Sequence, residues 1–207
     1  MIPMSNECNV SSCPELCLEV CDDLTLTGFT TLLQSGLYLE VAQGCSIGKL
    51  LLGLPGFTEE YIAAKVQTIF LNGLPADDLG QQLTGESGVL AVSAAMPGLA
   101  GAIFRRGGIH ASLRTSVEAV PESSITENPV RIRLKMFNMI AKDRGIPILR
   151  QGCVVLATAL RKFLIYRGQL ADNISYAEAD QVSLETKDLA AFLDSTQYIN
   201  LSISKKI

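Results

Sequence analysis

The sequence is poor in aromatic and charged residues: it has no tryptophan and a single histidine, and only 18% of its residues are charged. By contrast, 48% are hydrophobic, which is enough apolar material for a core and excludes general disorder. No apolar run reaches the roughly 18–20 residues that are needed to cross a bilayer. The first residues, MIPMSNEC, include an acid and no base, unlike a secretory signal. We therefore expect a cytoplasmic protein that is not bound to a membrane.

Familiar catalytic and cofactor motifs are also missing. There is no GxSxG elbow for a nucleophile, and the single histidine, His110, has no histidine partner with which to hold a metal. Segment 44–50, GCSIGKL, has one residue too few between its glycines for a Walker loop, and it ends in Leu50, where a hydroxyl would bind magnesium. We expect no catalytic residue and no cofactor, and we favour a protein that is not an enzyme.

Four of the six cysteines lie within the first 21 residues, at Cys8, Cys13, Cys17 and Cys21. Their spacing, C-x4-C-x3-C-x3-C, lacks the CxxC pairs of zinc sites and the closer run of iron–sulfur clusters. Two interpretations remain: small buried residues beside a frayed N-terminus, or metal and redox chemistry. We favour the first and expect no bound metal.

Charge is distributed unevenly along the chain, whose formal net charge is −4. Residues 1–100 carry two lysines against eleven acids, a net of −9, whereas residues 101–150 carry nine bases against four acids, a net of +5. Residues 151–207 balance six bases with six acids. Such a separation can hold two parts of a chain or two copies together, or attract an anionic partner.

Strands are predicted where apolar and polar residues alternate, or where β-branched residues end at a turn signal. Residues 109–117 and 130–137 alternate most regularly. Further strands are expected at 17–27, 29–36, 37–43, 66–73, 88–94 and 198–204, with a hairpin at 174–184.

Helices are predicted from capping residues and from apolar stripes at helical spacing. Ser46 and Thr58 are expected to begin two short helices. Further helices are expected over 138–144, 153–167 and 186–194, of which the second has the strongest apolar stripe.

The first half has the element order strand, strand, helix, strand, turn, strand and glycine-rich end, which resembles a β-grasp, or ubiquitin-like, domain. The resemblance covers residues 17–108 and is carried by the segments LYLEVAQGCSIGKLLLGL, VQTIFLNGLPADD and LTGESGVLAVSAAMPG. Within that group it resembles the sulfur-carrier type, which includes the small subunit of molybdopterin synthase and the thiamine sulfur carrier.

The resemblance implies a chemistry that depends on a terminal Gly-Gly, which in sulfur carriers is adenylated and then holds sulfur as a thiocarboxylate. Gly107-Gly108 would be the corresponding pair, but 99 residues follow it. An internal peptide carbonyl cannot be adenylated. The sulfur-carrier interpretation therefore requires cleavage after Gly108.

The expected fold class is α+β, with a β-grasp-like N-terminal domain and a smaller α+β C-terminal part that could share a sheet with it. We expect a flexible, cysteine-containing N-terminus at residues 1–16 and the β-grasp-like domain with its glycine-rich corner at 17–117. A linker at 118–129, EAVPESSITENP, would then lead to the C-terminal domain at 130–207.

The glycine-rich corner is a candidate anion site. Consecutive backbone N–H groups can bind a phosphate, and neighbouring arginines would add charge. The alternative, a structural corner, is favoured because neither a Walker motif nor GxGxxG is present. The residues of the candidate site are Gly98, Gly101, Arg105, Arg106, Gly107, Gly108 and His110.

A basic stripe is the candidate interface, formed by Arg114 on one strand and by Arg131, Arg133 and Lys135 on another. Nucleic-acid-binding surfaces interleave aromatic residues with basic ones, whereas these strands carry no outward aromatic residue and the pI is near 5.1. We therefore expect the stripe to face the acidic first half, within one chain or in a dimer, and we do not expect nucleic acid as a partner.

These observations predict a non-enzymatic binding or accessory protein that acts through protein–protein contacts, with a protein partner or a second copy of itself. One alternative is a binder of a small anionic, phosphate-bearing ligand at the glycine–arginine corner. Another is a sulfur-carrier relative that is active only after cleavage at Gly108.

Overall fold

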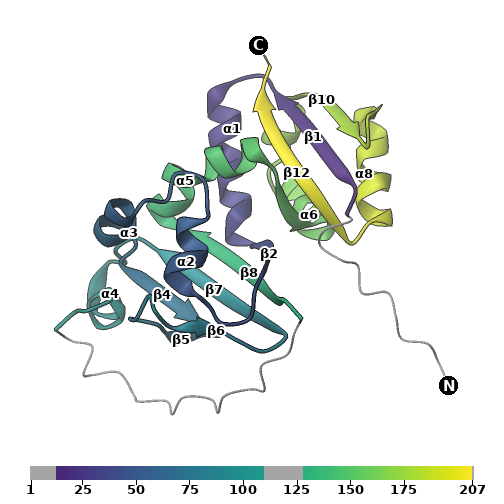
Figure 1. Ribbon diagram of the computed structural model, residues 1–207. Helices are drawn as coiled ribbons and strands as arrows, with labels where there is room; N and C mark the ends of the chain where they lie inside the picture. Colours follow the sequence, from purple (N-terminus) through teal and green to yellow (C-terminus); the bar gives the residue numbers. More distant parts are fainter. Residues whose placement is uncertain (1–12, 110–127, 207) are drawn as a thin grey trace. The chain divides into compact units, whose positions relative to one another are not determined.

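The chain folds into two compact units in a computed structural model that describes residues 13–109 and 128–206. The terminal unit combines Met1–Leu32 with Leu149–Ile207, and the inserted unit consists of Leu33–Ile148. Helices occur with mixed sheets in both units, so the fold class is α+β, as predicted (Figure 1). Among the described residues, no helix is long and apolar enough to span a bilayer.

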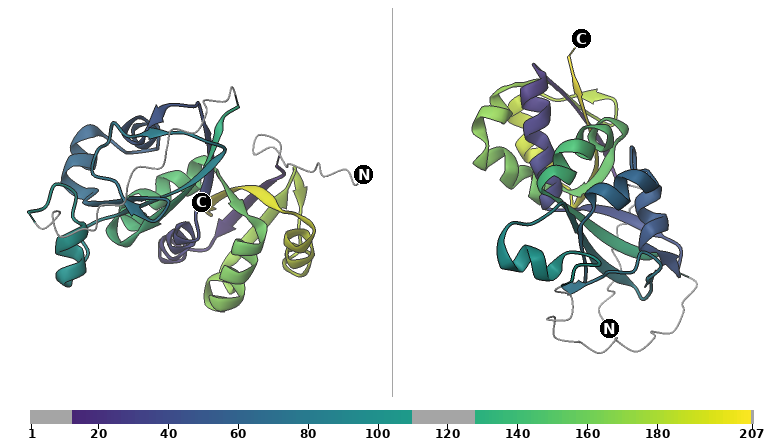
Figure 2. Two further views of the ribbon diagram at one scale, coloured as in Figure 1. Left: turned by 90° about the horizontal axis from the view of Figure 1, so that it is seen from below. Right: turned by 90° about the vertical axis from the view of Figure 1, so that its left-hand side faces the viewer.

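The sheet of the terminal unit has the strand order β11-β10-β1-β12-β9. β1 (Glu15–Val20) runs antiparallel to β10 (Ile174–Ala179) and parallel to β12 (Tyr198–Lys205). The two views of Figure 2 show β1 and β12 side by side although they come from opposite ends of the chain. The remaining elements are α1 (Asp23–Phe29), β9 (Cys153–Leu156), α6 (Ala157–Tyr166), α7 (Gly168–Asp172), β11 (Val182–Ser183) and α8 (Thr186–Ser195). The short helix η2 (Thr30–Gln34) begins in this unit and ends in the inserted one.

One face of this sheet and the helices form the core of the terminal unit. Leu16, Leu18 and Val20 alternate along β1 with more exposed residues and are themselves fully buried. Phe29 of α1 packs against Phe163 of α6, with 5.3 Å between the ring centroids. The apolar half of each strand therefore points towards the helices.

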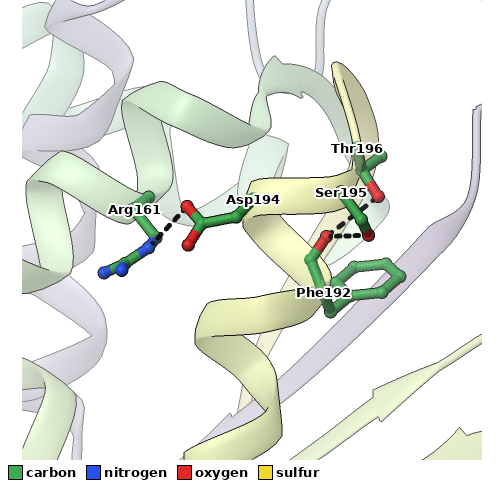
Figure 3. Close-up of polar contacts among 5 residues, drawn as sticks. All are labelled: Arg161, Phe192, Asp194, Ser195 and Thr196. Carbon is green, nitrogen blue, oxygen red and sulfur yellow. Dashed lines mark hydrogen bonds and ion pairs between the residues drawn. The ribbon is translucent and has the colours of Figure 1, made fainter.

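Polar contacts link α6 to α8 and end α8 (Figure 3). Arg161 of α6 donates to the carboxylate of Asp194 at 2.8 Å, but an ion pair this exposed contributes little stability. The hydroxyls of Ser195 and Thr196 both donate to the backbone carbonyl of Phe192, at 2.8 and 3.0 Å. They satisfy an acceptor that the end of a helix leaves without an N–H partner.

The sheet of the inserted unit has the strand order β2-β8-β7-β4-β5. β8 (Val130–Phe137) lies between β2 (Leu37–Val41), to which it is antiparallel, and β7 (Ser87–Ser93), to which it is parallel. The remaining elements are β3 (Cys45–Ser46), α2 (Ile47–Leu52), α3 (Glu59–Lys65), β4 (Thr68–Leu71), β5 (Leu74–Pro75), β6 (Gln82–Leu83), α4 (Gly98–Phe104) and most of α5 (Asn138–Gln151), whose last three residues belong to the terminal unit. β3 and β6 form a separate antiparallel pair.

Local sequence signals explain several of these boundaries. The Ser46 hydroxyl accepts the N–H of Lys49 and begins α2, and the Thr58 hydroxyl accepts the N–H of Tyr61 and begins α3. Both predicted caps are confirmed. Asn72 and Gly73 have positive φ values of 52° and 82°, which suit the tight turn between β4 and β5.

Three stretches differ from the sequence-based prediction. Residues 17–36 were expected to form a strand pair, but only β1 is a strand there, because Asp22 caps α1 by accepting the N–H of Thr25 at 2.7 Å. Residues 153–167 were expected to form one helix, but Cys153–Leu156 form β9 by pairing with β12. The helix that was expected to end at Gly145 instead continues as α5 through Pro147.

The division of the chain also differs from the expected one. A boundary at 118–129 would assign β8 to the C-terminal part, but β8 pairs with β2 and β7 in the inserted unit. β1 pairs with β10 and β12 of the C-terminal part. Strands of the two expected parts therefore share sheets, and the inserted unit interrupts the terminal unit in sequence.

This arrangement predicts what happens when the chain is cut after Gly108. With a protease site placed there, the two pieces of the full chain will stay together after cleavage, because β8 bonds to β2 and β7, and β1 bonds to β10 and β12. Gel filtration of the cleaved protein in native buffer will show one peak with both pieces, and denaturant will separate them. Two separate peaks in native buffer would contradict this strand pairing.

Candidate functional site

The basic residues of β8 lie on the outward face of the inserted unit's sheet, which is the face opposite the buried apolar residues. Arg131, Arg133 and Lys135 alternate along β8 with fully buried apolar residues. The strand register places side chains of β2 and β7 beside them. We call this surface the basic face, and it consists of Arg131 with Glu40 and Ser87, Arg133 with Tyr38 and Val89, and Lys135 with Ala91.

Arg131 forms an ion pair with Glu40 of the neighbouring strand, with 3.6 Å between guanidinium nitrogen and carboxylate oxygen. The two side chains are 32% and 22% exposed. Glu40 is the single acid at the outward positions of β2, β8, β7 and β4, all of which the structure describes. It offsets one of the three positive charges and leaves the face positive.

Arg133 is fixed by contacts with the turn before β2. Its Nε and Nη2 atoms both donate to the backbone carbonyl of Ser35, at 2.9 and 2.6 Å. Its guanidinium carbon lies 5.8 Å from the ring centroid of Tyr38, within the range of a cation–π contact. Gly36 has a φ of 102°, and a Cβ there would lie 2.8 Å from the Arg133 side chain. Arg133 therefore stabilises this turn while its charge stays on the face.

Lys135 forms no hydrogen bond or ion pair with another described residue. Its neighbours are apolar: Ala91 lies opposite it on β7, and Phe70 of β4 lies opposite Ala91. Phe70 packs against Phe104 of α4 with 5.3 Å between ring centroids. Lys135 is therefore a partly exposed base on a partly apolar surface, and it has no anionic partner among the described residues.

The glycine-rich corner is organised around α4 and Arg106. Gly98 has a φ of 77° at the start of α4, and a Cβ on Gly101 would overlap the Met96 carbonyl. The Arg106 guanidinium donates to the carbonyl of Ile62 at 3.3 Å, and its backbone N–H donates to Gln67 at 2.7 Å. These contacts fasten the segment after α4 to the end of α3 and the start of β4.

The other residues predicted for these two sites are placed as follows. Arg105 is exposed, and Gly107 has a φ of 64°. The backbone N–H of Gly108 donates to the carbonyl of Arg105 at 3.0 Å, which closes a turn. His110, Arg114 and most of the expected linker at 118–129 lie outside the described residues.

Of the N-terminal cysteines, Cys17 lies at an outward position of β1, and Cys13 and Cys21 lie just before and just after that strand. The Ser202 hydroxyl donates to the Cys17 sulfur at 3.2 Å. The described part of the chain contains no group of three histidine, cysteine or acidic side chains placed to hold a metal. Cys8 lies outside the described residues. Burial raises the pKa of the Cys153 thiol to about 12.

A tyrosine, an aspartate and an arginine join α3 to α5 in the inserted unit. The Tyr61 hydroxyl donates to Asp143 at 3.3 Å, and the Arg144 guanidinium carbon lies 3.7 Å from the Tyr61 ring centroid. Burial, followed by the charge of Asp143, raises the pKa of Tyr61 to about 12. Tyr61 is therefore protonated at neutral pH and serves as a structural link between the helices.

A hollow between β2 and α2 was not predicted from the sequence. It has a volume of about 560 Å³. Leu39, Val41, Leu50 and Leu54 supply apolar walls, and polar side chains stand among them. The polar lining residues are Glu40, Gln43, Cys45, Ser46, Lys49 and Gln82. Segment 39–54 contains both walls, but its sequence does not reveal the gap between strand and helix.

Comparisons with known proteins give no family for this chain. No family model matches the sequence, and neither a curated protein nor a solved structure matches it. The candidate sites therefore rest on the geometry of the chain itself.

The contacts of Arg133 predict a loss of stability on its replacement. Arg133→Lys keeps the charge but loses the two-pronged bond to Ser35, so the free energy of unfolding should fall by about 1–3 kcal/mol. Arg131→Lys is the matched control, and its effect should be smaller because lysine can still form the longer, partly exposed ion pair with Glu40. Urea unfolding measures both. Equal stability of the Arg133→Lys variant and the original chain would contradict this role.

The burial of the thiols predicts their order of reaction. At pH 8, iodoacetamide should alkylate the exposed Cys21 at least about a hundredfold faster than Cys153, because the thiolate is the reactive form. Peptide mapping by mass spectrometry over time measures both rates in the folded protein. In denaturant the two rates should converge, and similar rates in the folded protein would show that Cys153 is accessible.

Proposed function

We propose that this chain is a non-enzymatic binding protein and that the basic face holds an acidic surface of a protein partner. The observation that carries the proposal is that two bases occupy neighbouring outward positions of β8. Lys135 has no polar partner among the described residues, and the guanidinium of Arg133 is held in place by the Ser35 carbonyl. Both side chains stand on one sheet face whose outward positions include a single acid, Glu40.

The composition of the basic face supports a protein partner. Arginine and tyrosine are enriched at protein–protein interfaces and among the residues that dominate their binding energy. Arg133 and Tyr38 lie side by side here, and Val89 beside them is 37% exposed. A surface with both charge and apolar area can attract a partner and also exclude water from the contact.

The alternative of an anionic small-molecule site at the glycine–arginine corner has weaker support. The Arg106 guanidinium is already bonded to the end of α3, and its direction is set by that contact. On the basic face Arg133 is bonded to a backbone carbonyl in the same way, but Lys135 beside it has no such contact with a described residue. This difference favours the basic face.

For the fold of the inserted unit, we propose a β-grasp-like arrangement with permuted strand order. When β8 is counted first, the unit contains an antiparallel strand pair, β8 and β2, then helices, β4, a turn, β5 and β7. This is the order that the sequence resemblance implied, except that the first strand comes from the end of the unit. Cleavage after Gly108 would then break the covalent link between the unit and its own first strand and leave them joined only by strand pairing, which weakens the sulfur-carrier alternative.

An acidic probe tests the proposed function. A fluorescent polyglutamate peptide should bind the full chain at low salt, and binding should weaken as salt rises from about 0.05 to 0.5 M because exposed charges become screened. Lys135→Glu should weaken binding by roughly three- to tenfold, since one attractive charge becomes repulsive. Fluorescence anisotropy measures the affinity.

The matched control is Lys142→Glu, which reverses an exposed charge on α5 instead of β8. It changes the net charge by the same amount and should leave most of the binding intact. Equal losses in the two variants would mean that the peptide responds to net charge, and the basic face would not be the binding surface.

A further inference from the structure

The outward face of the terminal unit's sheet is acidic. Glu15, Cys17 and Glu19 alternate along β1 with fully buried apolar residues. The register places Glu178 of β10 opposite Cys17 and Tyr176 opposite Glu19, while β12 contributes small polar side chains. We call this surface the acidic face, and it consists of Glu15, Cys17, Glu19, Tyr176, Glu178, Asn200, Ser202 and Ser204.

No basic side chain lies at the outward positions of β1, β10 and β12, all of which are within the described residues. Lys205 lies opposite Val20, on the helix-covered side, and its amine bonds to Asp23 of α1 at 2.7 Å. The Tyr176 hydroxyl donates a hydrogen bond to the Glu178 carboxylate at 2.7 Å, and Tyr176 is 38% exposed. The acidic face therefore presents carboxylates that no cation on its own strands offsets.

We propose that the basic face of one copy of this chain binds the acidic face of a second copy. The inference rests on the proposed function and names its partner. Each face has the opposite charge of the other, and each also carries apolar or aromatic area: the exposed Val89 and the partly exposed Tyr38 on one, and the exposed Tyr176 on the other. The two surfaces are complementary in both respects.

The spacing of the charges matches as well. Side chains on one face of a strand recur every second residue, or about every 6.6 Å. Arg131, Arg133 and Lys135 occupy three consecutive outward positions of β8. Glu15 and Glu19 span the same two steps on β1, and Glu178 lies at the level between them, one strand away. Two carboxylates of β1 thus span the same distance as Arg131 and Lys135, and a third lies at the level between them on the neighbouring strand.

This contact joins unlike surfaces, so each interface uses one basic and one acidic face. Two such contacts close a dimer if the copies are related by a two-fold axis, and otherwise the contact repeats in a ring or chain. Sheets that pack face to face hold their strands about 30° or about 90° apart, and both arrangements set rows of side chains against each other.

Sedimentation of the full chain over a concentration series at about 0.05 M salt tests the inference. Lys135→Glu and Glu19→Lys should each weaken self-association by roughly tenfold, because each damages one of the two faces. An equimolar mixture should restore association between the variants, since the intact acidic face of one meets the intact basic face of the other. A fluorescent label on the Lys135→Glu variant reports the mixed complex.

Lys142→Glu and Asp172→Lys are the matched controls, because each reverses an exposed charge on a helix of the same unit. Both should associate like the original chain. Circular dichroism checks the folding of every variant, and Glu15→Lys replaces Glu19→Lys should the latter not fold.

The outcomes separate this inference from the proposed function. A chain that stays monomeric at low salt but binds polyglutamate through Lys135 would overturn the second-copy partner and leave the proposed function standing. A chain that neither associates nor binds the peptide would overturn both. Association that both face variants leave unchanged would also overturn the inference, because the contact would then lie elsewhere.

Discussion

The inserted unit depends on β8, because this strand is the hydrogen-bonded neighbour of both β2 and β7. The parallel pairing of β8 with β7 requires a long crossover connection, and α4 lies within it. One side of β8 contributes four buried apolar residues to the core, while the other presents Arg131, Arg133 and Lys135. The fold of the unit and its candidate interface therefore depend on the same eight residues.

In the terminal unit, β1 has the corresponding position, because it lies between β10 and β12 and pairs with both. Because β10 and β12 follow the inserted unit in sequence, β1 finds its neighbouring strands only after the whole inserted unit. Long-range pairings of this kind cost loop entropy before their contacts form. Both sheets are thus completed by strands that are distant in sequence, which explains why a boundary drawn along the chain does not separate the units.

Sequence patterns predicted the helices and strands that are determined by interactions between residues close in sequence. The alternation of 130–137 and 198–204, and the caps Ser46 and Thr58, act within a few residues and were found as expected. Cys153–Leu156 were missed because a short apolar run suits a strand or a helix equally, and pairing with β12 decides between them. Likewise, the outward arginines were predicted, but their aromatic neighbour Tyr38 was not, because it comes from β2 and its position depends on strand register.

The three bases of the basic face differ in what they can contribute to binding. Arg133 is already held by the Ser35 carbonyl and by Tyr38, so it loses little side-chain freedom when a partner arrives. The charge of Arg131 is partly offset by the carboxylate of Glu40, which weakens its attraction for a partner. Lys135 has a flexible stem and a compact, strongly hydrated charge, so its attraction acts at a distance but fixes no single geometry. A partner would therefore be attracted by both Lys135 and Arg133 but oriented mainly by Arg133, so the arginine that stabilises the turn would also set the register of the contact.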